Sequence, residues 1–256
     1  MRKKLIVGNW KMNMLRKEAL ELAQELSELL GDLNEVDIVI APPYTSLDIV
    51  YQVIRKTNIK LAAQNVFWEP SGAFTGEVSP YMLRDSGCRW VIIGHSERRG
   101  ILGESDTMAQ RKIKASIKAG LIPILCVGET LEERERGNTM KVIKNQIKNG
   151  LNDVNINNPD GIEIAYEPVW AIGTGKNATP EEAEEVHGLI REILSKIFIG
   201  IADKMRILYG GSVTPENIKD LISPPGIDGA LVGGASLRAE SFAKIVKIIG
   251  GIQNWT

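Results

Sequence analysis

The chain has 256 residues, of which 43% are hydrophobic and 25% are charged, an ordinary balance for a folded globular protein. Its formal net charge of −1 excludes a global attraction to nucleic acid or to an anionic membrane, so any anion site has to be local. The sequence contains no apolar stretch near the roughly 20 residues that a membrane-spanning helix needs.

The amino terminus begins basic and then apolar, like a secretion signal. The apolar run stops at Gly8-Asn9-Trp10-Lys11, too early for the apolar core of such a signal. The two cysteines, Cys88 and Cys126, form no C-x-x-C pair and suggest no disulfide framework, so we expect structural thiols in a reducing compartment. A cytoplasmic location is therefore predicted.

Short apolar runs alternate with longer segments of helical periodicity along the chain. Most of the runs are continuous rather than alternating, which is typical of strands buried on both faces of a parallel sheet. They begin roughly 20–45 residues apart, the spacing of strand–helix units. The eight runs lie at residues 5–7, 37–41, 60–63, 90–93, 122–127, 162–166, 206–209 and 229–232.

Between the runs, apolar residues recur with the 3.6-residue period of amphipathic helices. Three predicted buried faces are Leu22, Leu26 and Leu29; Ala183, Val186, Ile190, Ile193 and Ile197; and Phe242, Ile245, Val246 and Ile249. A capping residue followed by proline predicts helix starts at Ser79-Pro80, Thr179-Pro180 and Thr214-Pro215. Glu182, three residues after Thr179, completes a capping box with it.

Eight strand–helix units predict an α/β fold, the closed (β/α)8 TIM barrel, with residues 1–256 forming a single catalytic domain. No linker or low-complexity segment interrupts the pattern. The alternative is an open doubly wound sheet, which these patterns alone exclude only weakly.

In a parallel barrel the active site lies at the carboxyl ends of the strands, so polar residues just after each run are the candidates. Taken alone, each has an ordinary explanation, such as a solvated surface lysine, a structural histidine, a turn-accepting glutamate or a tight glycine turn. Their expected convergence at one mouth is what favours a site. The candidates are Asn9, Lys11, His95, Ser96, Glu97, Glu167, Gly210-Gly211-Ser212 and Gly233-Gly234-Ala235-Ser236.

The glycine pairs after the seventh and eighth runs predict a phosphate site, because glycine lets backbone N–H groups approach an oxyanion. Gly173-Thr174-Gly175-Lys176 looks like the end of a P-loop, but Trp170 and Asn177 stand where that motif needs glycine and Ser or Thr. No dinucleotide fingerprint follows the first run, and two histidines 92 positions apart give no metal-ligand pattern. We therefore expect neither a cofactor nor a metal.

Taken together, these motifs resemble the triosephosphate isomerase family from Gly8 to about Ala239. The resemblance implies interconversion of dihydroxyacetone phosphate and D-glyceraldehyde 3-phosphate by proton transfer through an enediolate, without a cofactor, in glycolysis and gluconeogenesis. It also implies a homodimer. The matching stretches are Gly8-Asn9-Trp10-Lys11, Gly72-Ala73-Phe74-Thr75-Gly76-Glu77, Gly94-His95-Ser96-Glu97, Cys126-Val127-Gly128-Glu129 and Tyr166-Glu167-Pro168-Val169-Trp170, with Ala171-Ile172-Gly173-Thr174-Gly175-Lys176 after the last.

The resemblance implies roles for the catalytic residues. Glu167 matches the general base, an uncharged His95 the electrophile, and Lys11 the cation that offsets the negative charge of the substrate. Asn9 lies beside the substrate, and Glu97 is an adjacent acid.

The resemblance further implies a phosphate cradle and a lid. Asn9 and Lys11 are expected to bind the substrate, and residues 168–178 to close over it and exclude water. The backbone positions expected to hold the phosphate are Gly173, Ser212, Gly233 and Gly234.

The segment 64–77, from Gln64 to Glu77, is predicted to dock into a second copy of the chain. It exceeds the usual loop of about 4–6 residues, and the apolar side chains of Val66, Phe67, Trp68 and Phe74 would be costly to leave in water. The alternative is a loop folded onto its own barrel.

Two other functions remain open at this point. A phosphate-binding aldolase would use a strand-end lysine, such as Lys11, to form a Schiff base. A non-catalytic binding or scaffold protein would be expected to have lost the base or the electrophile, yet both Glu167 and His95 are present.

Overall fold

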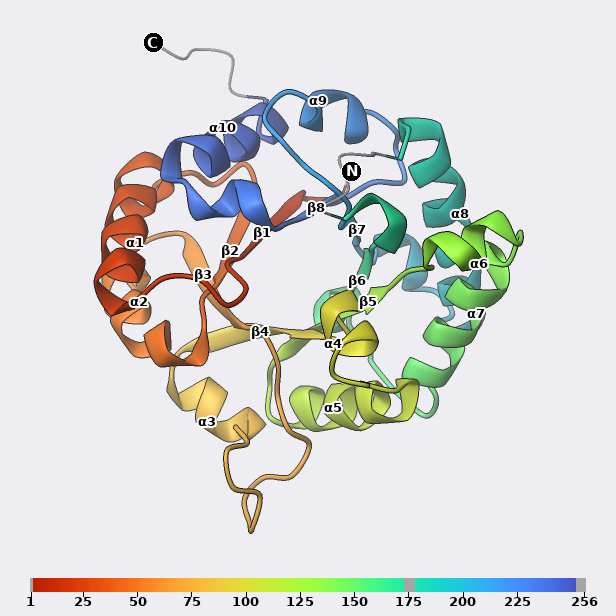
Figure 1. The fold of residues 1–256 in the computed structure, drawn as a ribbon, viewed down its shortest axis with the longest axis horizontal. Helices are drawn as coiled ribbons and strands as arrows, with labels where there is room; N and C mark the ends of the chain where they lie inside the picture. Colours follow the sequence, from red (N-terminus) through yellow and green to blue (C-terminus); the bar gives the residue numbers. More distant parts are fainter. Residues whose placement is uncertain (1, 173–177, 252–256) are drawn as a thin grey trace.

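The framework of this computed structural model, which describes residues 2–172 and 178–251, is a closed barrel of parallel strands in chain order (Figure 1). β8 pairs with β1, from Leu5 opposite Gly229 to Gly8 opposite Val232, so the sheet closes on itself. The predicted closed barrel is confirmed, and the open-sheet alternative is wrong. The strands are β1 (Leu5–Asn9), β2 (Asp37–Ala41), β3 (Ile59–Ala63), β4 (Cys88–Ile93), β5 (Ile122–Val127), β6 (Glu163–Tyr166), β7 (Ile207–Tyr209) and β8 (Gly229–Val232).

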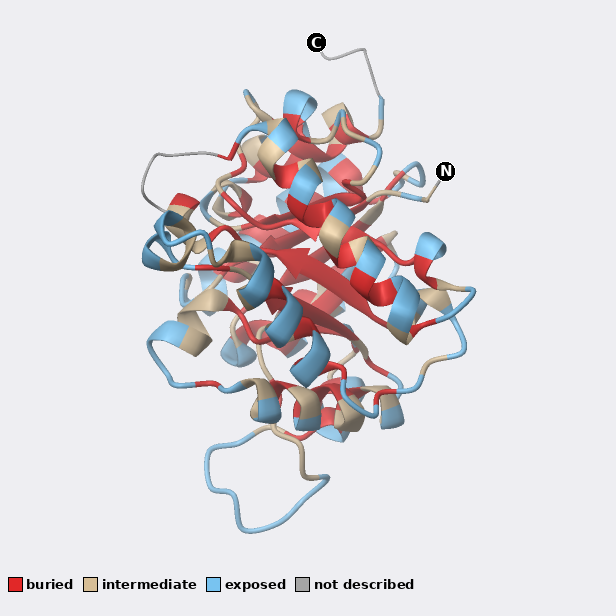
Figure 2. Cartoon of the chain, turned by 90° about the vertical axis from the view of Figure 1, so that its right-hand side faces the viewer, coloured by how far each residue is buried: buried red, intermediate tan, exposed pale blue. Residues whose placement is uncertain are grey.

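Helices form a ring outside the barrel, with buried faces toward the strands and exposed faces outward (Figure 2). None of the described helices combines the length and apolar character needed to cross a bilayer. The helices are α1 (Arg16–Leu30), α2 (Leu47–Ile54), α3 (Pro80–Asp85), α4 (Ser96–Gly100), α5 (Asp106–Lys118), α6 (Leu131–Glu135), α7 (Thr139–Gly150), α8 (Pro180–Ile197), α9 (Ile218–Leu221) and α10 (Ala239–Ile249). Short 3-10 turns lie at Tyr44–Ser46, Pro159–Gly161, Val169–Ala171, Ala202–Lys204 and Gly234–Leu237.

The strands are buried on both faces, as continuous apolar runs predict. Alternate side chains fill the barrel, and the others pack against the helices. Cys126 is among the inward residues, and both Cys88 and Cys126 are buried thiols. Burial raises the pKa of Cys88 to about 12, so this thiol is unreactive at neutral pH.

The predicted helix faces are confirmed with two exceptions. On α1 the side chain of Leu29 is 38% exposed, and Leu30 is buried in its place, because a step of four residues from Leu26 stays closer to the core. On α8, Ile197 is only half-buried.

Two of the three predicted helix starts are confirmed. Ser79 accepts a hydrogen bond from the backbone N–H of Met82, and Thr179 and Glu182 form the capping box. The start at Thr214-Pro215 is wrong, since residues 215–217 form a turn and α9 begins at Ile218. The backbone N–H of Thr214 instead donates to Oδ1 of Asn217.

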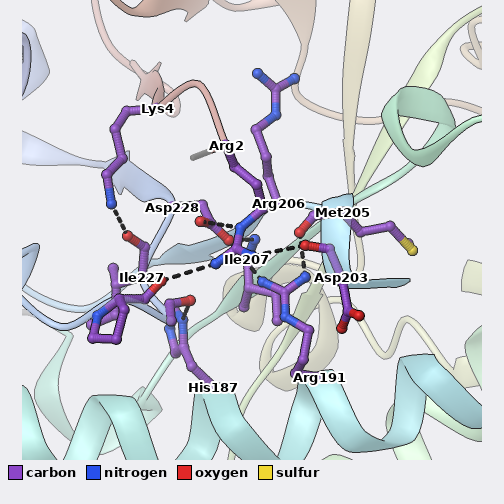
Figure 3. Close-up of polar contacts among 12 residues, drawn as sticks. Arg2, Lys4, His187, Arg191, Asp203, Met205, Arg206, Ile207, Ile227 and Asp228 are labelled. Atoms are coloured by element: carbon purple, nitrogen blue, oxygen red, sulfur yellow. Dashed lines mark hydrogen bonds and ion pairs between the residues drawn. The ribbon is translucent and has the colours of Figure 1, made fainter. Parts of the chain in front are cut away.

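A buried carboxylate joins distant segments at the amino end of the barrel (Figure 3). Asp228, just before β8, is 2% exposed and accepts from Nε of Arg2 at 2.5 Å and from Nη2 of Arg191 at 2.8 Å. It also accepts from the backbone N–H of Ile207 at 3.0 Å. Arg191, on α8, donates further to the carbonyl oxygens of Ala202 and Met205. This carboxylate therefore holds the amino-terminal arm, α8 and β7 to the start of β8.

The substitution Asp228→Asn should lower the free energy of unfolding by roughly 3–5 kcal/mol, because it leaves partly buried arginines without their counter-charge. Urea unfolding followed by circular dichroism, at one fixed protein concentration, measures the change. The matched control is Glu192→Gln, which removes the exposed pair with Lys196 on α8 and should have a much smaller effect. Equal effects of the two variants would contradict the role given to Asp228.

Candidate active site

The carboxyl ends of the strands surround a cavity of about 290 Å³. Ten of the candidate residues line it, whereas Ser96 and Ser236 do not, Glu97 contacts it through Lys11, and Gly173 lies outside the described residues. A larger hollow of about 830 Å³ lies at the opposite end of the barrel and contains none of these residues. The cavity is lined by Asn9, Lys11, His95, Glu167, Ile172, Gly210, Gly211, Ser212, Val213, Thr214, Leu231, Gly233, Gly234 and Ala235.

Glu167 and His95 lie in direct contact inside the cavity. The backbone N–H of Glu167 donates to the carbonyl oxygen of Val127 at 2.7 Å, which fixes the carboxylate at the end of β6. Its Oε1 lies 2.8 Å from Nε2 of His95, and its Oε2 accepts from the backbone N–H of Ser96 at 2.8 Å. The carboxylate is 2% exposed, so both of its oxygens are held within the protein.

The tautomer of His95 follows from its second ring nitrogen. Nδ1 accepts from the backbone N–H of Glu97 at 3.3 Å, because His95 caps the first turn of α4. Nε2 therefore carries the proton and donates toward Glu167. Burial disfavours the charged imidazole, but the charge and hydrogen bond of Glu167 outweigh it and raise the pKa of His95.

Lys11 is held by its backbone in an unusual conformation. Its φ of 54° is left-handed, and its N–H donates to Oδ1 of Asn9 at 3.0 Å. Nε2 of Gln64 donates to the carbonyl oxygens of Lys11 and Ala41, both at 2.8 Å. The Nζ of Lys11 reaches Oε1 of Glu97 at 2.5 Å, so the ammonium group stays at the rim of the cavity.

Two glycines at the mouth of the barrel have close neighbours, and at Gly128 the neighbour is backbone, so only glycine fits. A Cβ on Gly233 would lie 3.3 Å from Cε of Lys11, so a larger residue there would crowd the cationic side of the cavity. A Cβ on Gly128 would lie 1.7 Å from the carbonyl oxygen of Glu167, which no side chain can tolerate. The turn at Gly233 and Gly234 begins the 3-10 segment whose backbone lines the cavity.

Comparison with known proteins shows the family to which this chain belongs. The family model described as Triosephosphate isomerase matches residues 4–249. The triosephosphate isomerase of Trichlorobacter lovleyi is 54% identical over 251 residues, covering 98% of this chain and 100% of that protein. The chain belongs to the triosephosphate isomerase family.

Two further likenesses agree with membership of the triosephosphate isomerase family. The protein of that name from Carboxydothermus hydrogenoformans is 56% identical over 248 residues, covering 96% of this chain and 99% of the relative. The crystal structure of triosephosphate isomerase from Bartonella henselae has a TM-score of 0.89 and 37% identity, covering 96% of this chain and 98% of the other. Membership overturns the aldolase and scaffold alternatives.

Some residues that support the triosephosphate isomerase site were not singled out from the sequence. Gln64, which holds Lys11, directly follows the third apolar run, so the rule applied to the other strands would have found it. Glu104 is 3% exposed and accepts from the backbone N–H of Gly94 at 2.9 Å, next to His95. It also accepts from Nε of Arg98 and Nζ of Lys112, both at 2.6 Å. No sequence pattern marks Glu104, because its partners meet only in the folded chain.

The start of the expected lid is tied to the barrel by Glu129. Oε1 of Glu129 accepts from Oη of Tyr166 at 3.1 Å and from Nε1 of Trp170 at 2.9 Å. Arg134 lies over the ring of Trp170, with Cζ 4.4 Å from its centroid, and donates to Glu129 at 3.3 Å and to Glu182 at 2.5 Å. Arg134 therefore contacts elements on both sides of the segment at residues 173–177.

The two histidines of the chain allow a direct test of the coupling between Glu167 and His95. Burial lowers the pKa of His187 to about 4, despite the carbonyl oxygen of Gly226 at 3.2 Å from Nδ1. The substitution Glu167→Gln should lower the pKa of His95, because it removes the anion that favours the charged ring, and should leave His187 unchanged. Imidazole titration by ¹H–¹⁵N NMR measures both values. A pKa of His95 that does not fall in the variant would contradict the coupling.

Proposed function

We propose that Glu167, His95 and Lys11 carry out the triose-phosphate isomerase reaction of this chain, which interconverts dihydroxyacetone phosphate and D-glyceraldehyde 3-phosphate. The observation that carries the assignment is the 2.8 Å contact between the carboxylate of Glu167 and Nε2 of His95 inside a cavity that also contains Lys11. Isomerisation needs a base near a carbon and a proton donor near the adjacent oxygen. These two side chains are the matching pair.

The reaction proceeds by two proton transfers at neighbouring carbons. Glu167 leaves Ser96 and His95, and its carboxylate takes the proton from the carbon next to the carbonyl group. His95 donates from Nε2 to the carbonyl oxygen as negative charge grows there, and the resulting enediolate is reprotonated by Glu167 at the other carbon. Departure of Glu167 also removes the charge that raises the pKa of His95, which favours an uncharged imidazole during the reaction.

The phosphate of the substrate lies at the glycine turns on the far side of the cavity. Ser212, Gly233 and Gly234 line that part of the cavity, and their backbone N–H groups are the expected donors to the phosphate, with Gly173 as the fourth. Lys11, whose Cε approaches Gly233, offsets the charge of the phosphate and of the enediolate. Residues 168–178 close over the substrate and exclude water, because an exposed enediolate phosphate would eliminate its phosphate.

The substitution Glu167→Asp should retract the base by about 1 Å and lower kcat roughly a hundredfold. A coupled assay with glyceraldehyde 3-phosphate measures kcat and KM. The control is Glu133→Asp, which shortens an exposed capping-box glutamate on α6 and should leave kcat unchanged. Near-normal turnover of Glu167→Asp would mean that another residue is the base.

The same proposal includes a homodimer built on the loop at residues 64–77. Residues 70–77 are exposed and project from the body of the molecule (Figures 1 and 2). The first part of the loop packs on its own subunit, since Val66 is buried and Trp68 lies against Arg111 of α5. Its aromatic side chains pack on one another, with ring centroids of Phe67 and Phe74 4.7 Å apart. Other exposed apolar side chains on the same subunit are Met12, Leu15, Met82, Ile101 and Leu102.

A twofold dimer would cover these apolar side chains with one self-complementary surface. Met12 is 94% exposed and directly follows Lys11, so a docked partner would contact the backbone beside the catalytic lysine. We expect Thr75 of one subunit to approach the region of Asn9, Lys11 and His95 in the other. Assembly and catalysis are therefore expected to depend on each other.

The double substitution Phe74→Glu and Thr75→Arg should give a folded monomer with strongly reduced kcat, because it places charges in the apolar contact. Sedimentation velocity and the coupled assay, at matched protein concentrations, test both parts. Ile199→Glu is the control, since Ile199 is 87% exposed after α8 and away from the loop, and it should change neither mass nor kcat. A fully active monomer would refute the dependence of catalysis on assembly, and a stable dimer would show that the main contact lies elsewhere.

A cytoplasmic location and a single catalytic domain over residues 1–256 complete the proposal. The buried thiols of Cys88 and Cys126 suit a reducing compartment. The described strands close one barrel whose mouth holds the whole candidate site, apart from Gly173.

A further inference from the structure

Two charged side chains stand out at the amino ends of the barrel strands, away from the isomerase cavity. Lys60 is the second residue of β3, and Arg89 is the second residue of β4. Among the strand residues that the structure describes, these two alone are exposed. Both lie at the open amino end of the barrel, where solvent reaches them, and core packing requires a cation at neither position.

An irregularity in the sheet accompanies these two cations. Leu61 pairs with Cys88, but the next residue, Ala62, pairs with Trp90. Arg89 is therefore an extra residue in β4 at this point, as in a β-bulge, and bulges commonly redirect a side chain. The backbone thus presents Arg89 to solvent next to β3.

Lys60 and Arg89 border a cavity of about 290 Å³, which we term the basic hollow. Its volume equals that of the isomerase cavity, so it can accept a molecule of similar size. Four of its lining residues are cationic and none is a carboxylate, which is unusual in a chain with a net charge of −1. The basic hollow is lined by Tyr51, Ile54, Arg55, Ile59, Lys60, Leu61, Arg84, Gly87 and Arg89.

Most donors of the four cations are uncommitted. Nη1 of Arg84 donates to the carbonyl oxygen of Cys88, and Nζ of Lys60 to that of Thr57, each at a long 3.3 Å. Arg89 lies over the ring of Trp90, with Cζ 5.7 Å from its centroid. Across residues 2–172 and 178–251, none of the four cations forms an ion pair with a carboxylate. A guanidinium group has five N–H donors and an ammonium group three, so many remain available to a ligand.

Helix capping explains only part of this arrangement. Arg55 and Arg84 lie at the carboxyl ends of α2 and α3, where a cation offsets the partial negative charge of the helix. Lys60 and Arg89 lie on strands, so this effect does not apply to them. Their presence beside the two arginines is the observation that favours a ligand.

The neighbouring hollow of about 830 Å³ provides a contrast. It shares Lys60 and Arg89, but its other arginines are paired with carboxylates. Arg206 binds Glu163 and Asp37, and Arg2 binds Asp228. The two arginines that belong to that hollow alone are thus paired with carboxylates, whereas no carboxylate lines the basic hollow.

We propose that the basic hollow is a second anion site, which binds a small phosphorylated metabolite carrying two phosphate groups. Arginine matches phosphate through paired N–H donors, and four cations around one cavity exceed what a single phosphate needs. The walls formed by Ile54, Ile59 and Leu61 suit the carbon skeleton between the two phosphates. The site lies at the amino ends of β3 and β4, so it is separate from the triose-phosphate cavity at the carboxyl ends.

Pyrophosphate, the smallest molecule with two linked phosphates, is the probe for this site. In ¹H–¹⁵N TROSY spectra of the intact protein, the amide of Gly87 reports on the basic hollow and that of Gly234 on the isomerase cavity. Titration should shift the Gly87 amide saturably, more tightly than inorganic phosphate does. Because the contacts are charged and open to solvent, binding should weaken as salt is raised.

Arg84→Gln and Arg89→Gln should each weaken pyrophosphate binding at Gly87 about tenfold or more, as expected for loss of a charge-assisted hydrogen bond. Neither variant should change the response of Gly234 or the kcat of isomerisation, which also shows that the barrel is folded. The control is Arg238→Gln, which removes an exposed arginine beside Glu18, Glu21 and Glu240 and should leave both responses unchanged. A Gly87 response that is absent, that fails to saturate, or whose midpoint in both arginine variants is unchanged from that of the unsubstituted protein would overturn the proposal.

Discussion

The strands can share one mouth only because β8 pairs with β1 and all pairings are parallel. Closure removes exposed sheet edges and places every carboxyl end of a strand on the same side. Lys11 and Gly233 are far apart in the sequence, yet a Cβ on Gly233 would approach Cε of Lys11 to 3.3 Å. The carboxylate of Glu167 reaches His95 across the same opening. The site residues therefore meet only because the sheet closes into a barrel.

The two ends of the barrel use charge in different ways. At the amino end, Asp228 and Glu163 each bind arginine, so buried charge is balanced within the protein and contributes to stability. At the carboxyl end, the partners of Glu167 are an imidazole and a backbone N–H, neither of which carries a fixed positive charge. A carboxylate held in that way can leave its partners at a modest electrostatic cost. An arginine-bound carboxylate such as Asp228 cannot.

Sequence patterns predicted the strands well, but they predicted less well which helix residues are buried and which side chains form hydrogen bonds. Continuous apolar runs located every strand, because burial on both faces excludes polar residues from most strand positions. Periodicity placed Leu29 instead of Leu30 in the core, since both lie near the edge of the buried face. The proline signal at Thr214 preceded a turn, and side-chain bonding by Asn217 decided that outcome.

The residues that support the site were harder to predict than the candidate residues themselves. Glu104 acts through Gly94, Arg98 and Lys112, and such partners are set by tertiary packing and not by spacing. Exposure of Lys60 was also beyond the pattern, because a residue within a predicted strand gives no sign of how close it lies to the open end of the barrel. Local sequence thus predicts the buried faces of helices and the ends of strands. Contacts between side chains that are distant in the sequence can be identified only in the folded structure.

Arg134 links two segments of the chain on either side of residues 173–177. Its guanidinium group contacts Glu129 and the ring of Trp170, and also Glu182 in the first turn of α8. While these contacts persist, one side chain links the ring of Trp170 to the first turn of α8. Any movement of these two parts relative to each other has to break a contact of Arg134.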